Sequence, residues 1–144
     1  MTDNNQILVF AQSIARAAGA LMISELRKQG GPESHYKFAG TELVTEADIK
    51  VDKLICDAIR QQYPGHLLLA EESAPDLAGL SQITAPLWVI DPIDGTVNYA
   101  HDHGQSAVSI AFIEHGHVQV GVVFNPFVDE MFYACRGQGA FLNG

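Results

Sequence analysis

One stretch constrains the fold of this chain more than any other, because it is an apolar run that ends in two acidic residues. The stretch reads LWVIDPIDGTVNYA and spans residues 87–100. Its first four residues are apolar and predict a buried strand, and Asp91 and Asp94 follow at the end of that strand. Unpaired charges are costly at the edge of a core, so we expect a cation to lie beside them.

Two amphipathic helices are predicted before this strand. Apolar residues recur with helical spacing from Ile7 to Met22, and the Gly-Gly-Pro sequence at residues 30–32 ends that pattern. A polar loop is expected from there to Val44. The second helix should begin after Thr45, where the sequence TEAD resembles a capping box, and end at a Tyr-Pro-Gly sequence.

The remaining apolar segments predict strands. HLLLA leads into Glu71, LWVI leads into Asp91, and SAVSIAFIE, VQVGVVFN and EMFYACR follow as successive antiparallel strands. Because the helices precede the sheet rather than alternating with its strands, the fold class is α+β, with two helices packed on a mostly antiparallel sheet. Residues 1–144 are expected to form one metal-binding domain.

Composition excludes several classes of function. The net charge of -9 disfavours direct contact with nucleic acid or with an anionic membrane, and it suits the binding of metal cations. The polar start MTDNNQ lacks the basic region of a signal peptide, so we expect a cytoplasmic protein. Cys56 and Cys135 are far apart in the sequence and are expected to be small buried hydrophobic residues.

The acidic residues at the strand ends suggest a specific chemistry. If the strands before Glu71 and Asp91 are neighbours, several carboxylates converge, and a hard divalent cation such as Mg²⁺ would neutralise them. Gly95 would allow close approach of the backbone to an anion, and Thr96 supplies a hydroxyl. Together these groups fit metal-assisted hydrolysis of a phosphate ester, with Glu71 and Thr96 as candidates to assist the attacking water.

Each of these residues also has a simpler interpretation. Asp48 could serve only as a helix cap, and Asp91 with Asp94 could form an Asx-type turn that closes the strand. Glu72 is more simply a solvated neighbour of Glu71, because adjacent strand residues face opposite ways. The motif that surrounds Asp91 and Asp94 favours the metal interpretation for that pair.

The motifs WVIDPIDGTVNY, LVTEAD and AEES together resemble the inositol monophosphatase family of Mg²⁺-dependent, lithium-sensitive sugar phosphatases. The resemblance implies the N-terminal half of the αβαβα sugar-phosphatase fold. It also implies that Glu71, Asp91 and the carbonyl of Ile93 hold one Mg²⁺ ion. Asp91 and Asp94 would help to hold a second ion, and Glu71 would contact a third, so the complete enzyme would use two or three ions.

By the same resemblance, Gly95 and Thr96 would contact the substrate phosphate. Thr96, Asp48 and Glu71 would orient the attacking water, and Lys37 would be a loop contact near the site. The implied substrate is a small phosphorylated polyol or sugar, such as inositol 1-phosphate, and we expect a homodimer. Family members are much longer than this chain, so we expect a truncated protein that is weakly active or inactive alone.

Two alternatives remain open from the sequence. An aspartyl-phosphate phosphatase of the haloacid dehalogenase type carries a similar Asp-x-Asp-Gly-Thr signature, in which the first Asp attacks phosphorus. The spacing here is Asp-x-x-Asp-Gly-Thr with a proline after the first Asp, which changes the direction of the second carboxylate. A regulatory or binding module that does not need catalysis is the other alternative.

Overall fold

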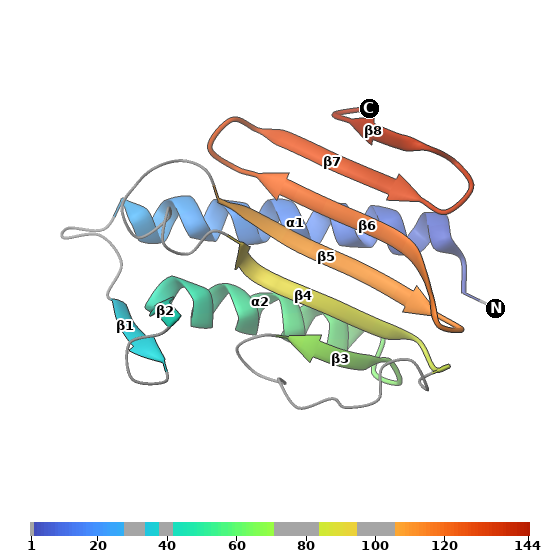
Figure 1. The fold of residues 1–144 in the computed structure, drawn as a ribbon, viewed down its shortest axis with the longest axis horizontal. Coiled ribbons are helices and arrows are strands. Elements are labelled where there is room, and N and C mark those ends of the chain that lie inside the picture. The colour runs from blue at the N-terminus through green and yellow to red at the C-terminus, as the bar shows by residue number, and fades with distance from the viewer. Residues whose placement is uncertain (1, 28–33, 38–41, 71–83, 95–105) are drawn as a thin grey trace.

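Two helices cover one face of a six-stranded mixed sheet in the computed structural model (Figure 1). It describes residues 2–27, 34–37, 42–70, 84–94 and 106–144, and only the backbone of residues 34–37 and 42–45. The elements are α1 (Asn4–Leu26), β1 (Ser34–Lys37), β2 (Glu42–Thr45), α2 (Glu46–Gln62), β3 (Leu67–Ala70), β4 (Leu87–Asp94), β5 (Ala107–Glu114), β6 (His117–Asn125), β7 (Glu130–Cys135) and β8 (Ala140–Leu142). This arrangement confirms the predicted α+β class.

The strand order in the sheet is β3-β4-β5-β6-β7-β8, and the strands from β4 to β8 pair antiparallel with their sequence neighbours. Only β3 runs parallel to its partner, β4. A parallel pair needs a crossover connection, whereas the antiparallel strands can follow one another through short turns. The strands that lead to Glu71 and Asp91 are therefore neighbours.

Helix α1 begins at a polar cap and buries one face against the sheet. The backbone N–H of Asn5 donates to Oδ1 of Asp3, the N-cap residue, over 2.9 Å. Ile7, Ala11 and Ala18 are among its fully buried residues, and the helix contacts β5, β6 and β7. By length and apolar composition alone α1 could also cross a membrane, a test that core helices of soluble proteins pass as well.

Helix α2 starts directly after β2 and packs against β4 and α1. Its first turn contains Glu46 and Asp48, whose charges favour the positive end of the helix dipole. Val51, Ile55 and Ile59 recur with helical spacing, and all three are fully buried.

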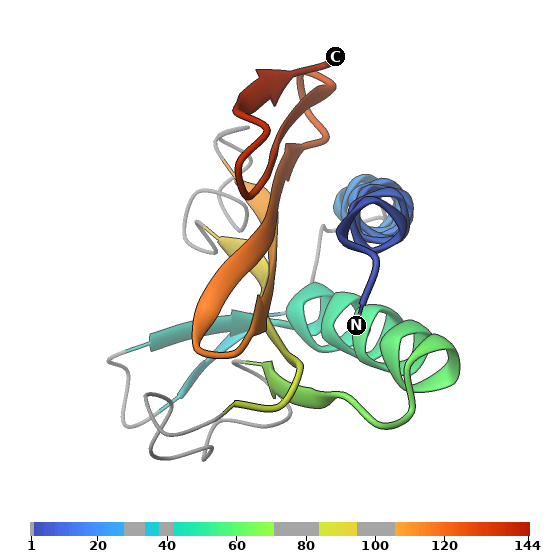
Figure 2. The same cartoon turned by 90° about the vertical axis from the view of Figure 1, so that its right-hand side faces the viewer.

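The two faces of the sheet differ in what covers them. The inner face carries Trp88, Ile90, Val108, Ile110 and Phe112, which are at most 3% exposed, and both helices lie on this side (Figure 2). The opposite, outer face is covered by no helix or strand of the described residues. Trp88, which is 0% exposed, belongs to the core. The buried positions of Cys56 and Cys135 agree with prediction.

The expectation of a plain loop up to Val44 is wrong. Strands β1 and β2 pair antiparallel within that segment, with Ser34 opposite Thr45 and Lys37 opposite Glu42. Each strand has only four residues, and Ser34–Lys37 lacks the apolar alternation that would have indicated a strand. A two-stranded hairpin of this length depends on tertiary context, which local sequence does not reveal.

Candidate functional site

The candidate site lies at the edge of the sheet where β3 and β4 both end. In their parallel register Leu67 pairs with Leu87 and Ala70 pairs with Ile90, so the two carboxyl ends reach the same edge. Asp91 follows Ile90 directly within β4. The N-terminal end of α2 lies at this same end of the molecule (Figure 1). Three separate parts of the chain thus approach one location.

A β-bulge in β4 sets the direction of its two aspartates. Asp91 pairs with Ser109 and Asp94 pairs with Ala107, so three steps along β4 match two steps along β5. In a regular strand, residues three apart face opposite sides of the sheet, whereas the extra residue brings both aspartates to the same side. Pro92 lies inside this irregular stretch, where a missing N–H costs no regular ladder bond.

Asp91 and Asp94 differ in their exposure to solvent. Ile93 is 2% exposed and anchors the bulge in the core, while Asp94 is exposed at the strand end. Asp91 is partly buried, and its Oδ1 atom is enclosed within the protein. By register both aspartates belong to the outer face, because Ile90 belongs to the inner one. Carboxylates held in this way fit a hard divalent cation, which prefers oxygen ligands.

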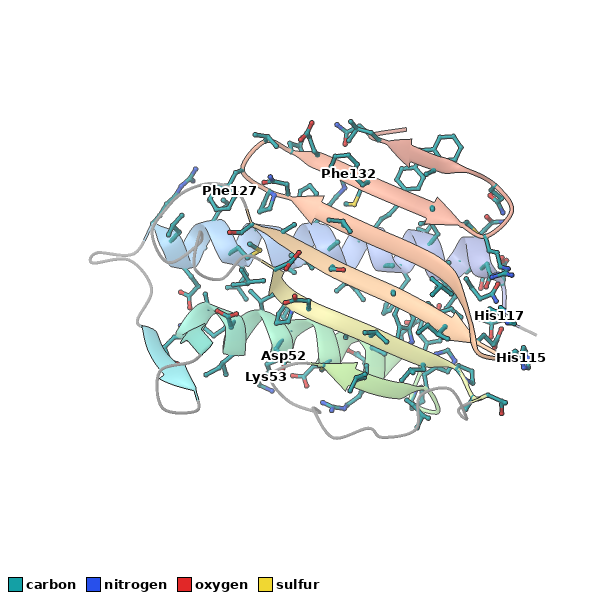
Figure 3. The ribbon with its side chains drawn as sticks, in the orientation of Figure 1. Asp52, Lys53, His115, His117, Phe127 and Phe132 are labelled. Atoms are coloured by element: carbon teal, nitrogen blue, oxygen red, sulfur yellow. The ribbon has the colours of Figure 1, made fainter. Side chains whose placement is uncertain are left out.

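Helix α2 supplies a second pair of acidic residues. Asp48 is 2% exposed and Asp52 is 3% exposed, and they lie one helical turn apart. Asp52 Oδ1 accepts a hydrogen bond from Sγ of Cys56 over 3.5 Å, and Figure 3 shows Asp52 on the helix beside the solvent-facing Lys53. Buried carboxylates are rare without polar or charged partners, and Cys56 is such a partner for Asp52.

The structure does not describe the side chains of the other predicted site residues. Glu71, Gly95 and Thr96 lie outside the described residues, and Lys37 ends β1 with its side chain outside them as well. Among the residues that the structure describes, no group of three His, Cys, Asp or Glu side chains is arranged to hold a metal ion. The roles assigned to these residues therefore stay predictions.

Sequence reasoning missed Asp52, although a signal for it was present. It lies four residues after Asp48 on a predicted helix, a spacing that places both carboxylates on one face. The apolar residues Val51 and Ile55 on either side mark that face as buried. An acidic residue within a buried helical stripe is the pattern that would have identified it.

The sequence of this chain is similar to those of known proteins of one family. The sequence profile of the "Inositol monophosphatase family" matches residues 3–144. Inositol monophosphatase 1 of Xenopus laevis is 40% identical over 134 residues, which cover 93% of this chain and 47% of that protein.

Two solved structures show the same similarity in three dimensions. An IMPase from Thermotoga maritima aligns with a TM-score of 0.84 and 34% identity, over 96% of this chain and 52% of that one. An IMPase/NADP phosphatase complexed with Mg²⁺ and phosphate aligns with a TM-score of 0.85 and 26% identity, over 98% of this chain and 52% of that one. This chain thus spans about half the length of the proteins that it matches.

Proposed function

Because this chain belongs to the inositol monophosphatase family, we propose that it forms the metal-binding half of a phosphatase for small polyol or sugar phosphate monoesters. The observation that carries this proposal is the bulge in β4, which turns Asp91 and Asp94 to one side of the sheet. The residue after Ala70, Glu71, continues the neighbouring parallel strand in sequence. The relative named as complexed with Mg²⁺ and phosphate supports the choice of a divalent metal and a phosphate ester.

In this proposal Glu71, Asp91, Asp94 and the carbonyl of Ile93 hold Mg²⁺, in two or three ions in the complete enzyme. Bound Mg²⁺ supplies a water of lowered pKa and neutralises charge that develops on the phosphoryl group. Carboxylates suit this task because Mg²⁺ takes one or two of them per ion and keeps its remaining positions for water and phosphate oxygens.

The other residues of the chain bind and orient the reactants. Gly95 and Thr96 would contact the phosphate through backbone N–H groups and a hydroxyl. Thr96 and Glu71 would orient the attacking water, helped by Asp48 from the first turn of α2. Lys37 would contact the substrate side of the site. Inositol 1-phosphate is the proposed type of substrate, in line with the name of the Xenopus laevis relative.

The same proposal extends to properties of the whole protein. Lithium inhibition, a cytoplasmic location and a homodimeric assembly remain predictions from the sequence. Since this chain spans about half the length of its relatives, we expect residues 1–144 alone to bind metal but to hydrolyse inositol 1-phosphate weakly or not at all.

Metal binding by Asp91 provides the direct test. Mn²⁺ is a suitable probe, because its electron paramagnetic resonance signal in water is lost when the ion binds a protein. We expect Asp91→Asn to weaken Mn²⁺ binding by at least about tenfold, because loss of even a group that supports a metal ligand costs about 10- to 100-fold. Added Mg²⁺ should compete with Mn²⁺ for the unsubstituted protein.

A matched control separates a ligand from a general loss of negative charge. Asp129 is an exposed acidic residue with a φ of 52°, a conformation that asparagine tolerates, so Asp129→Asn removes one charge without strain. This variant should bind Mn²⁺ as the unsubstituted protein does. Equal affinities for the Asp91→Asn and Asp129→Asn variants would show that Asp91 is not a ligand.

A further inference from the structure

A side-chain hydrogen bond joins the start of β3 to β4 at the end of the sheet away from the candidate site. Nε1 of Trp88 donates to Nδ1 of His66 over 3.0 Å. An indole nitrogen can only donate, so Nδ1 of His66 must be unprotonated and the imidazole neutral. The neutral ring then carries its single proton on Nε2. This contact therefore exists in one protonation state of His66 only.

The surroundings of His66 are aromatic. Its ring stacks on Tyr63, the residue after α2, with centroids 4.8 Å apart and an interplanar angle of 10°, and it lies 5.5 Å from the ring of Phe112 on β5. Trp88 itself is 0% exposed, so its indole N–H has no access to water as a substitute acceptor. Loss of the acceptor would leave the buried indole N–H without a hydrogen-bond partner. This costs more free energy than the removal of both partners would.

Among the described residues, burial and one carboxylate act on the pKa of His66. Burial lowers the pKa of the His66 imidazole, and the carboxylate of Glu114 on β5 opposes this more weakly. Tyr63, which directly follows α2, is the titratable group that stacks on His66, and its phenol stays neutral because burial and then Asp3 raise its pKa above the usual value. The neutral ring is thus the form that the fold favours near neutral pH, and acid is what would charge it.

The position of this hydrogen bond gives it a structural consequence. β3 is an edge strand with a single neighbour, and its ladder with β4 covers only the pairs from Leu67 with Leu87 to Ala70 with Ile90. One further backbone bond, from Leu67 N to the carbonyl of Pro86 over 2.9 Å, holds its beginning. So short a strand depends strongly on each additional attachment.

We propose that neutral His66 attaches the start of β3 to β4 through its hydrogen bond with Trp88, and that protonation of His66 breaks this hydrogen bond. Protonated His66 has donors at both ring nitrogens, so Nδ1–H and the indole N–H would face each other without an acceptor. The start of β3 should then separate from β4 more often in acid. This inference concerns the fold itself and stands apart from metal binding and from the proposed phosphatase activity.

Trp88 is the only tryptophan of the chain, so its indole N–H gives one resolved nuclear magnetic resonance signal. On lowering the pH from about 8 to about 5, we expect this signal to shift with a midpoint below the ordinary histidine value of about 6.5. Below that midpoint the indole proton should exchange with solvent about two- to tenfold faster, after correction for intrinsic rates, as the loss of one net hydrogen bond implies.

Two variants and one direct measurement complete the test. His66→Gln keeps an acceptor oxygen but cannot titrate in this range, so the indole signal should become independent of pH. His115→Gln changes an exposed histidine at the β5–β6 turn that makes no hydrogen bond to Trp88, and should leave the titration unchanged. A titration that persists in His66→Gln overturns the proposal. So does a ¹⁵N spectrum of the unsubstituted protein that shows a proton on Nδ1 of neutral His66, a result that does not depend on any variant folding.

Discussion

At the scale of single residues, Gly19 shows how closely α1 approaches the sheet. A Cβ atom added at this position would lie 2.5 Å from Cε2 of Phe124 and 3.0 Å from Cβ of Pro126. Both neighbours belong to the end of β6 and to the turn after it, and Phe124 is only 5% exposed, so it has little room to move. A glycine in the middle of a helix is normally unfavourable, which indicates that the close approach is what requires it here.

We therefore expect Gly19→Ala to destabilise the protein. Overpacking costs about 1–3 kcal/mol, and the better helix propensity of alanine returns up to about 1 kcal/mol, so the net loss should be about 1–2 kcal/mol. The measurement is the free energy of unfolding in urea. Gly121→Ala is the matched control, since a Cβ on that β6 residue meets nothing within 4 Å. An unchanged stability for Gly19→Ala would mean that α1 does not lie this close to Phe124.

The sequence indicated part of the site at this scale and left part of it hidden. Asp91 and Asp94 were identified because two acidic residues after an apolar run are unusual whatever the fold. The extra residue between them in β4 was not visible, because a bulge is defined against the partner strand β5. His66 was missed for a similar reason: its partner Trp88 is 22 positions away, and no local pattern connects them.

At the scale of elements, an ion pair connects the two helices. Nζ of Lys50 on α2 contacts Oε1 of Glu25 on α1, and the side chain of Glu25 is 4% exposed while that of Lys50 is 47% exposed. A buried carboxylate that loses its charged partner is strongly unfavourable, but solvent around Lys50 screens this pair. The contact therefore holds the end of α1 to the first half of α2.

We expect Lys50→Met, which keeps an apolar side chain of similar length, to lower the free energy of unfolding by about 1–2 kcal/mol, less than for a fully buried pair. Lys53→Met is the control. Lys53 pairs with Asp57 within α2, where both side chains are more than half exposed, so its loss should change stability by less than about 0.5 kcal/mol. Urea unfolding of both variants checks this, and equal effects would contradict a special role for the pair between the helices.

The elements differed in how well the sequence predicted them. α2 and β4 to β7 were predicted because apolar periodicity and turn residues act locally. The β1–β2 hairpin was missed because its strands carry no such pattern. The sequence did not predict that β3 pairs with β4, and their pairing was only an assumption. The pairing joins strands separated by residues 71–86 and depends on long-range contacts.

At the scale of the whole molecule, the outer face of the sheet is the feature with the largest consequence. A row of bulky apolar residues crosses β6, β7 and β8, where Val123 pairs with Phe132 and Phe132 pairs with Leu142. These three side chains are 40%, 45% and 46% exposed, respectively. Beside them runs a row of small residues, and together the rows line a groove of about 520 Å³. Exposed apolar patches of this kind mark interaction sites, and protein–protein interfaces are among them.

We expect the 144-residue chain to self-associate through this face in a concentration-dependent manner, despite its net charge of -9. Phe132→Glu places a charge in the centre of the row and should weaken association by at least about tenfold, as removal of a central aromatic contact does in other interfaces. Val9→Glu introduces the same charge on α1, at a residue that is 65% exposed and lies on the opposite side of the sheet from Phe132, and should leave association unchanged. Sedimentation equilibrium measures both constants. If the unsubstituted chain is monomeric at all concentrations, or if the two variants weaken association equally, the outer face is not the surface through which this chain associates.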